Sequence, residues 1–120
     1  MAPIVQDQLE GGVFRIAPAG RLDTFNVPAF EAALTEHLDT GRSRLVVDMA
    51  GVTYVSSSGL RALLSARRRA RVAGGDVLLC GMAPRVREIF EMVGFVSLFG
   101  IFASAQEAAD ALNADVSAGS

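Results

Sequence analysis

Two short, uninterrupted apolar runs constrain the fold of this chain more than any other feature. Arg44 to Asp48 encloses the run Leu-Val-Val, and Val77 to Cys80 forms a second run. Apolar runs this short are typical of strands that helices cover on both faces, and we expect the first run to be central in the sheet. Apolar residues at helical spacing lie before, between and after the two runs. Strands that alternate with single helices in this way predict an α/β fold with a largely parallel sheet.

The flanking segments complete the predicted order β-β-α-β-α-β-α-β-α. Strand-like runs at residues 4–9 and 13–19 flank Glu10-Gly11-Gly12 and predict an antiparallel hairpin, and Ile101-Phe102 suggests a last short strand. We therefore expect a mixed, mostly parallel sheet of about five strands with four helices, in one domain over residues 1–114. Residues 115–120 are small and polar and predict a flexible tail. The helices should begin near Pro28, at Ser57 or Ser58, at Pro84 and after Ser104, and should bury Val27, Phe30, Leu34, Leu38, Leu60, Leu63, Leu64, Ala70, Val86, Ile89, Phe90 and Val93.

The composition argues against several classes of protein. The sequence contains no lysine, so it has neither a P-loop nor an amine for Schiff-base chemistry. The formal net charge is −2, and the arginines of the cluster 67–71 are not interleaved with aromatic residues, so we expect no binding to nucleic acid. No apolar run approaches the roughly 20 residues of a membrane span, and residues 1–10 lack the features of a signal peptide, which favours a cytoplasmic protein. We expect His37 to be solvated or at an edge and Cys80 to be buried and inert, with no cofactor or metal site.

Three adjacent serines precede the second predicted helix, in the stretch Val55-Ser-Ser-Ser-Gly-Leu60. One serine at this position is enough to accept a hydrogen bond from an amide of the first turn. The other two hydroxyls are then spare, and Gly59 permits a close approach of another molecule. A nucleophilic serine would need a positioned base and a glycine on each side at two-residue spacing, and the stretch has neither. The serines therefore predict either helix capping alone or, in addition, a phosphoacceptor at the positive end of the helix dipole.

Other polar residues surround this stretch in the predicted fold. The loop from Met49 to Ser58 and the loop carrying Asp23 both leave carboxyl ends of predicted strands, where functional groups gather in such sheets. Arg61, Ser65 and Arg68 fall on one exposed line of the second helix, and they form either the rim of a partner surface or a solvated face. The apolar stretch 95–102 should pack in the core, and any part left exposed would support weak self-association, so we expect a monomer or weak dimer.

From about Val5 to Leu112 the chain resembles stand-alone STAS domains, specifically the bacterial anti-sigma factor antagonists. GRLDTFNVPAFEAAL resembles the Gly-x-Leu-Asp segment and first helix of that family, and LVVDMAGVTYVSSSGLRALL resembles its central strand, switch loop and second helix. Alignment on Gly59 places the family's phosphoacceptor at Ser57, with Ser56 and Ser58 as alternatives. Ser56 stands where the family commonly has aspartate. Asp23 and Asp48 match acidic positions near the switch, or they simply cap the turns that follow them.

The resemblance implies regulation of transcription by partner switching. The unphosphorylated protein would bind an anti-sigma factor that is also a serine kinase, and the sigma factor would be released. Phosphorylation of Ser57 would abolish binding, and a serine phosphatase would reverse it, so the protein would not itself be an enzyme. The alternative is a passive scaffold or ligand-sensing subunit of a signalling or transport complex, without phosphorylation. The partner surface implied by the resemblance and the exposed line comprises Asp23, Thr24, Ser56, Ser57, Ser58, Gly59, Arg61, Ser65 and Arg68.

Overall fold

A five-stranded sheet forms the centre of the molecule. The computed structural model describes the backbone of residues 4–119 and the side chains of residues 4–114. The sheet has the order β1-β2-β4-β6-β7, with β1 antiparallel to β2 and every other neighbouring pair parallel. Its central strand, β4, contains the Leu-Val-Val run, as the sequence predicts. The strands are β1 (Val5–Leu9), β2 (Val13–Ala17), β4 (Arg44–Asp48), β6 (Asp76–Cys80) and β7 (Ile101–Phe102).

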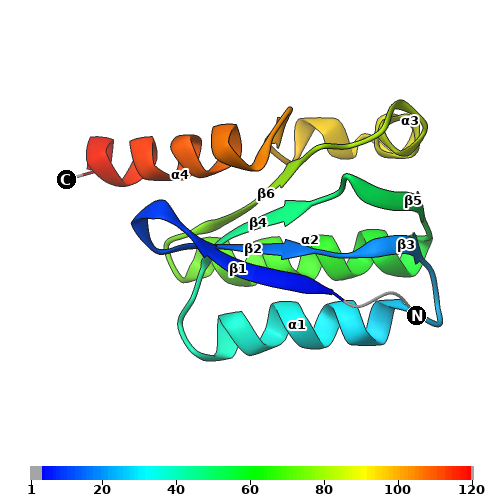
Figure 1. Cartoon of the computed structure of the whole chain (residues 1–120), viewed down its shortest axis with the longest axis horizontal. Helices are drawn as coiled ribbons and strands as arrows, with labels where there is room; N and C mark the ends of the chain where they lie inside the picture. The colour runs from blue at the N-terminus through cyan, green and yellow to red at the C-terminus, as the bar shows by residue number, and fades with distance from the viewer. Residues whose placement is uncertain (1–3, 120) are drawn as a thin grey trace.

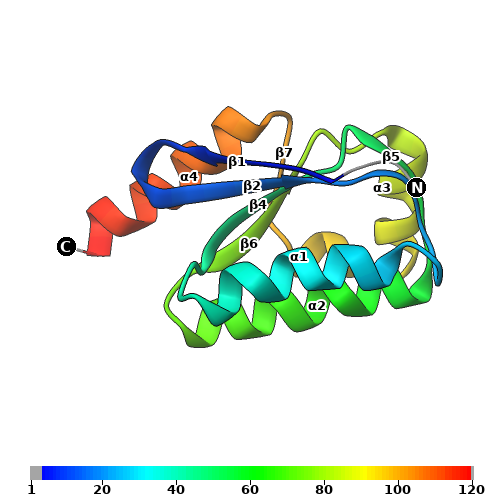
Figure 2. The same ribbon diagram turned by 60° about the horizontal axis from the view of Figure 1, so that its bottom comes forward.

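Helices cover both faces of the sheet (Figures 1 and 2). Helices α1 (Val27–Asp39) and α2 (Ser57–Val72) lie side by side on one face, and α4 (Ala105–Gly119) lies on the other. Helix α3 (Pro84–Met92) is placed beyond the end of the sheet, against β5. A single turn of 3₁₀ helix occupies Phe95–Ser97, and Glu10–Gly12 forms the tight turn between β1 and β2, with Gly11 and Gly12 at positive φ. The predicted four helices and mixed five-stranded sheet are confirmed.

The side chains of the central strands alternate between two cores. Leu45 and Val47 of β4 belong to the core under α1 and α2, whereas Val46 belongs to the core under α4. Strand β6 repeats the pattern, because Leu79 faces the first core and Leu78 the second. Because successive side chains of a strand point to opposite faces of the sheet, each uninterrupted apolar run contributes to two separate cores. Both strands are therefore covered by helices on both faces.

A second, smaller sheet of two strands was not predicted. Strands β3 (Ala19–Leu22) and β5 (Gly51–Val55) pair in parallel. The segment from Met49 to Ser58, which was predicted to be a loop, therefore contains a strand. Both strands are short, and the ladder shifts register between Gly20 and Arg21, where Gly20 has φ +80°. A glycine within so short a run removes the alternating pattern by which a strand is found in sequence.

Two predictions of exposure are wrong. His37 is 5% exposed, and its Nε2 lies 2.8 Å from Oε1 of Gln6 in β1. It shares the inward face of α1 with Phe30 and Leu34, because residues seven and three positions apart lie on the same side of a helix. Val93, expected to be buried, is 50% exposed, since α3 ends one residue earlier at Met92.

The last helix begins as the sequence predicts. Ser104 Oγ accepts a hydrogen bond from the backbone N–H of Glu107 at 3.2 Å, and the Glu107 carboxylate accepts one from Ala103 N–H at 3.2 Å. This reciprocal arrangement fixes the entry of the chain into α4. Helix α4 spans Ala105–Gly119 and thus includes most of the predicted tail. The flexibility of residues 115–120 stays a prediction, and Ser120 lies outside the described residues.

Candidate functional site

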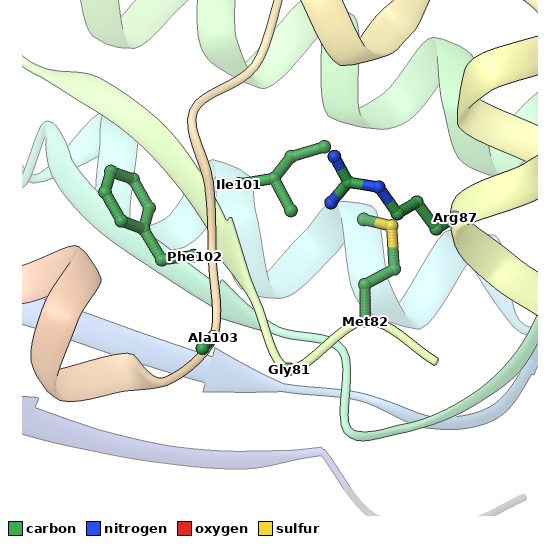
Figure 3. A pocket seen from close by; sticks show the side chains of 6 residues that line it. All are labelled: Gly81, Met82, Arg87, Ile101, Phe102 and Ala103. Carbon is green, nitrogen blue, oxygen red and sulfur yellow. The ribbon is translucent and has the colours of Figure 1, made fainter. Parts of the chain in front are cut away.

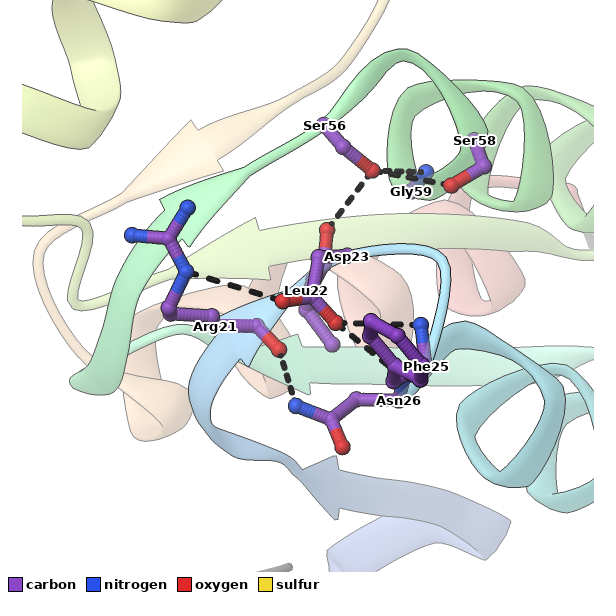
Figure 4. Close-up of polar contacts among 8 residues, drawn as sticks. All are labelled: Arg21, Leu22, Asp23, Phe25, Asn26, Ser56, Ser58 and Gly59. Carbon is purple, nitrogen blue, oxygen red and sulfur yellow. Dashed lines mark hydrogen bonds and ion pairs between the residues drawn. The ribbon is translucent and has the colours of Figure 1, made fainter.

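The small sheet brings the serine loop beside the loop that carries Asp23. Strands β3 and β5 are parallel and pair Leu22 with Val55, so their carboxyl ends meet. One residue further on, the backbone N–H and the side-chain hydroxyl of Ser56 both donate to the carbonyl of Leu22 at 2.9 Å, and Figure 4 shows the contact of the hydroxyl. The predicted meeting of the two loops at strand ends is therefore found, but the strands belong to the small sheet rather than to the five-stranded one.

The hydroxyl of Ser56 is the structural one of the three. It donates to the Leu22 carbonyl at 2.9 Å, accepts the N–H of Gly59 at 3.3 Å as the cap of α2, and lies 2.8 Å from Ser58 Oγ. A serine hydroxyl has one proton to donate and two lone pairs, so its donation to Leu22 makes Ser58 the donor to Ser56. The hydrogen-bonding capacity of Ser56 is then fully used, and the proton of the Ser58 hydroxyl is used as well.

Ser57 differs from both neighbours. It is the first residue of α2 and is exposed, whereas Ser56 and Ser58 are half-buried. Among the described residues, its side chain makes no hydrogen bond. The loop therefore holds one hydroxyl that no structural contact occupies, at a helix N-terminus where negative charge is stabilised.

Gly59 allows α2 to lie directly against β3. A Cβ atom built at this buried glycine would be 2.9 Å from Val55 Cγ1 and 3.0 Å from the Leu22 carbonyl oxygen. Contacts under 3.0 Å are not tolerated by ordinary Cβ atoms, so a side chain would push the helix start away from β3. In this structure the glycine serves close packing within the chain, in addition to any approach by another molecule.

Asp23 shapes the turn between β3 and α1. Its Oδ1 accepts the backbone N–H groups of Phe25 at 3.1 Å and Asn26 at 3.3 Å, and Arg21 Nε lies 3.6 Å from its Oδ2. The Asn26 side chain donates in turn to the Arg21 carbonyl at 2.7 Å. Thr24 is exposed within this turn. The turn-capping interpretation of Asp23 is thus correct, and the hydrogen bonds between the preceding residue, Leu22, and Ser56 place Asp23 beside the serine loop.

Asp48 does not belong to the same cluster. Its Oδ1 accepts the N–H of Ala50 at 3.0 Å, and its Oδ2 lies 3.7 Å from Arg15 on the neighbouring strand. The whole of β5 separates Asp48 from Ser56 along the chain. The structure assigns this carboxylate to the turn after β4.

Three polar residues continue the exposed face of α2 from Ser57. Arg61, Ser65 and Arg68 are all exposed, at spacings of four, eight and eleven residues from Ser57 that keep them on one side of the helix. Within the part of the chain that the structure describes, neither Arg61 nor Arg68 has a carboxylate within the 4.0 Å of an ion pair. The other arginines of the cluster are paired, Arg69 with Asp39 and both Arg67 and Arg71 with Asp76. The cluster is therefore not a continuous basic patch.

Sequence analysis missed an exposed aromatic residue beside the serine loop. Phe25, in the turn after Asp23, is 89% exposed. A signal was available, because Phe25 falls out of phase with the buried face of α1 set by Val27, Phe30 and Leu34. Tyr54, two residues before Ser56, is 37% exposed, and the Arg21 guanidinium stacks 4.4 Å from its ring centre.

A pocket lies away from this cluster, at the carboxyl ends of β6 and β7. It has a volume of about 450 Å³, and its only charged wall residue, Arg87, also lies 3.4 Å from Glu91 (Figure 3). One arginine among apolar side chains supplies no acid–base pair. The pocket is lined by Gly81, Met82, Arg87, Ile101, Phe102 and Ala103.

Other groups that could carry chemistry are isolated in the fold. Burial raises the pKa of Cys80 to about 12, so its thiol is protonated at neutral pH. No cluster of three or more metal-ligating side chains occurs among the described residues. Of the helices described, none combines the length and apolar character needed to cross a membrane.

Comparison with known proteins identifies the family. The model of the STAS domain matches residues 5–108. The chain belongs to the STAS domain family. It is 35% identical over 108 residues to BtrV of Bordetella bronchiseptica, a protein named as a candidate anti-sigma factor antagonist, and the match covers 90% of this chain and 91% of that protein.

Solved structures of STAS proteins share the fold. A candidate anti-sigma factor antagonist of Thermotoga maritima superposes with a TM-score of 0.85 at 15% identity, covering 92% of this chain and 94% of that one. The anti-sigma factor antagonist SpoIIAA in its unphosphorylated form superposes with a TM-score of 0.80 at 20% identity, covering 93% and 97%. The phosphorylated form of SpoIIAA from Bacillus superposes with a TM-score of 0.71 at 20% identity, covering 90% and 97%. Within the STAS family, the chain is thus similar to proteins named anti-sigma factor antagonists.

Proposed function

We propose that this protein is an anti-sigma factor antagonist that acts by partner switching in the cytoplasm, with Ser57 as the regulated phosphoacceptor. The observation that carries the proposal is the difference between the three serines. Ser56 and Ser58 are occupied by hydrogen bonds within the chain, whereas Ser57 is exposed and makes none among the described residues. The names of the relatives support the general role, and this difference supports the choice of residue.

The unphosphorylated protein binds an anti-sigma factor that is also a serine kinase, and the sigma factor is released. The kinase then transfers the γ-phosphoryl group of its own ATP to Ser57 Oγ, and ADP leaves. The folded domain accepts the modification, because the phosphate lies at the positive end of α2 and outside the hydrogen bonds that join the loops. A serine phosphatase restores the free hydroxyl. The protein is a ligand and a substrate in this cycle, not the catalyst.

The phosphate changes the binding surface far more than the fold. It adds about 1.5 to 2 negative charges to a domain with a formal net charge of −2. A partner in contact with α2 must then desolvate or repel that charge. Losing about 3 kcal/mol of binding free energy weakens an affinity more than a hundredfold, which is enough to release the partner.

The proposal is tested by phosphorylation in an extract of the native host. The purified protein is incubated with the extract and ATP, its intact mass is measured, and the phosphate is located by fragmentation. We expect one phosphate on Ser57, absent from the Ser57→Ala variant and removed by phosphatase. Ser97→Ala is the control, because Ser97 is an exposed serine that lies outside the proposed partner surface. A protein that stays unmodified but still captures a partner from the extract would contradict the proposal. Helix capping would then be the only role left for the three serines.

A further inference from the structure

We propose that Phe25 is the apolar anchor of the partner surface around Ser57, and that the partner is a protein that offers an apolar pocket bordered by carboxylates. This inference rests on the proposed function and adds the chemistry of the partner's side. It is argued from the exposure of Phe25, the hydrogen bonds that fix its turn, its position beside Ser57, and Arg61 and Arg68, which have no ion-pair partner among the described residues.

The turn holds Phe25 outward by defined contacts. Asp23 Oδ1 accepts the N–H groups of Phe25 and Asn26, and the carbonyl of Asp23 accepts those of Asn26 at 3.0 Å and Val27 at 2.8 Å. The Asn26 side chain adds a bond to the carbonyl of Arg21 (Figure 4). The phenyl ring is 89% exposed, and the backbone that carries it is already fixed, so that backbone loses little conformational freedom when a partner covers the ring.

Helix packing places Phe25 level with the serine loop. Helices α1 and α2 lie side by side (Figure 2), and Arg69 of α2 donates to Asp39 of α1 at 2.8 Å. Glu31 lines one small groove together with Ala62. Both pairs are offset by about 30 residues, so the helices run in the same direction and both begin at the same end of the molecule. The turn before α1, which contains Phe25, therefore neighbours the first turn of α2, which contains Ser57.

The charged residues near Ser57 indicate which charges a partner should carry. Within the described residues, Arg61 and Arg68 have no carboxylate within ion-pair distance. Among the described carboxylates near α2, that of Asp23 is engaged in its turn, that of Glu31 lines the groove beside Ser65, and that of Asp39 pairs with Arg69. Aromatic residues and arginines are the side chains that dominate the affinity of protein interfaces. Carboxylates of the partner that face Arg61 would also repel a phosphate on Ser57. The same charges that favour docking would therefore favour release of the partner after phosphorylation.

The test measures the initial rate of Ser57 phosphorylation against protein concentration, with ATP and native-host extract as the kinase source. We expect Phe25→Ala to raise the apparent KM at least about tenfold with little change in the maximal rate. Phe25→Leu should recover part of the loss. Val72→Ala is the matched control, because Val72 is 91% exposed at the opposite end of α2 and should leave KM unchanged. All three variants should keep a thermal midpoint within about 3 °C of the wild type, since both side chains are exposed.

The arginines are tested in the same assay. Arg61→Gln should raise KM and reduce its dependence on salt, whereas Arg85→Gln, at an exposed position on α3, should do neither. An unchanged KM for Phe25→Ala, with Ser57 still phosphorylated, overturns the inference and leaves the proposed function standing. No phosphorylation of the wild type overturns both. A dimer detected by light scattering that Phe25→Ala dissociates would assign Phe25 to a second copy of this chain instead.

Discussion

Replacing Ser56 with alanine removes the hydroxyl that joins the two loops of the site. The helix loses its cap on Gly59 N–H, which contributes about 1 kcal/mol at such positions. The Leu22 carbonyl keeps the backbone bond from Ser56 N–H, and Ser58 loses its partner at a half-buried position. Together these losses give a decrease of about 1–2 kcal/mol in the free energy of unfolding. Denaturant unfolding followed by far-ultraviolet circular dichroism measures it, because the chain has no tryptophan.

Two further substitutions make the result specific. Ser57→Ala should change the free energy of unfolding by less than about 0.5 kcal/mol, because the Ser57 side chain is exposed and makes no hydrogen bond among the described residues. Ser56→Thr keeps a capping hydroxyl and should retain most of the stability. If Ser57→Ala destabilised the domain as much as Ser56→Ala, the structural and free hydroxyls would be wrongly assigned. A loss below about 0.5 kcal/mol for Ser56→Ala would refute the capping argument directly.

Two buried groups give predictions that do not involve the site. Burial, with a smaller contribution from Arg42, lowers the pKa of His37 below its ordinary 6.5, so the unfolded chain takes up this proton at higher pH than the folded one. Stability should therefore fall as the pH drops through about 6.5, and the decrease between pH 7.5 and 5.5 should be smaller in His37→Gln, as urea unfolding at the two values measures. Cys80, whose pKa burial raises to about 12, should resist a thiol reagent at pH 8 in the native state and react when urea unfolds the chain; rapid labelling without urea would contradict its burial.

The elements that could be predicted from the sequence are those in which apolar residues recur at a regular spacing. The runs in β4 and β6 and the faces of the four helices carry a clear period, because each buries a whole face against another layer. Strands β3 and β5 carry no such period. They form a two-stranded sheet at the border of the fold, where only Leu22, Val52 and Val55 are buried. Their pairing depends on contacts between segments about 30 residues apart, which a local pattern does not contain.

The location of the candidate site could be predicted, but the roles of its residues could not. The expectation that Asp23 and the serines meet at strand ends was correct in position even though two strands were missing from the prediction. The spacing of three serines cannot say which hydroxyl is occupied, because that depends on the carbonyl of Leu22, which is 34 positions away from Ser56. Phe25 was missed for a related reason. Its phase relative to the buried face of α1 indicated that the ring does not join that face, but its outward position depends on the turn fixed by Asp23, which a local pattern does not contain.

The contacts of Ser56 also give a physical reason for serine rather than aspartate at this position. Either residue can cap a helix by accepting an amide hydrogen bond. Only the hydroxyl can at the same time donate to the Leu22 carbonyl, 2.9 Å away, because an ionised carboxylate has no proton to give. Serine thus ties α2 to β3 through its side chain and keeps the loop neutral. The first negative charge on this loop would then be the phosphate itself, next to Arg61, so that a single modification changes the sign of the charge that a partner meets.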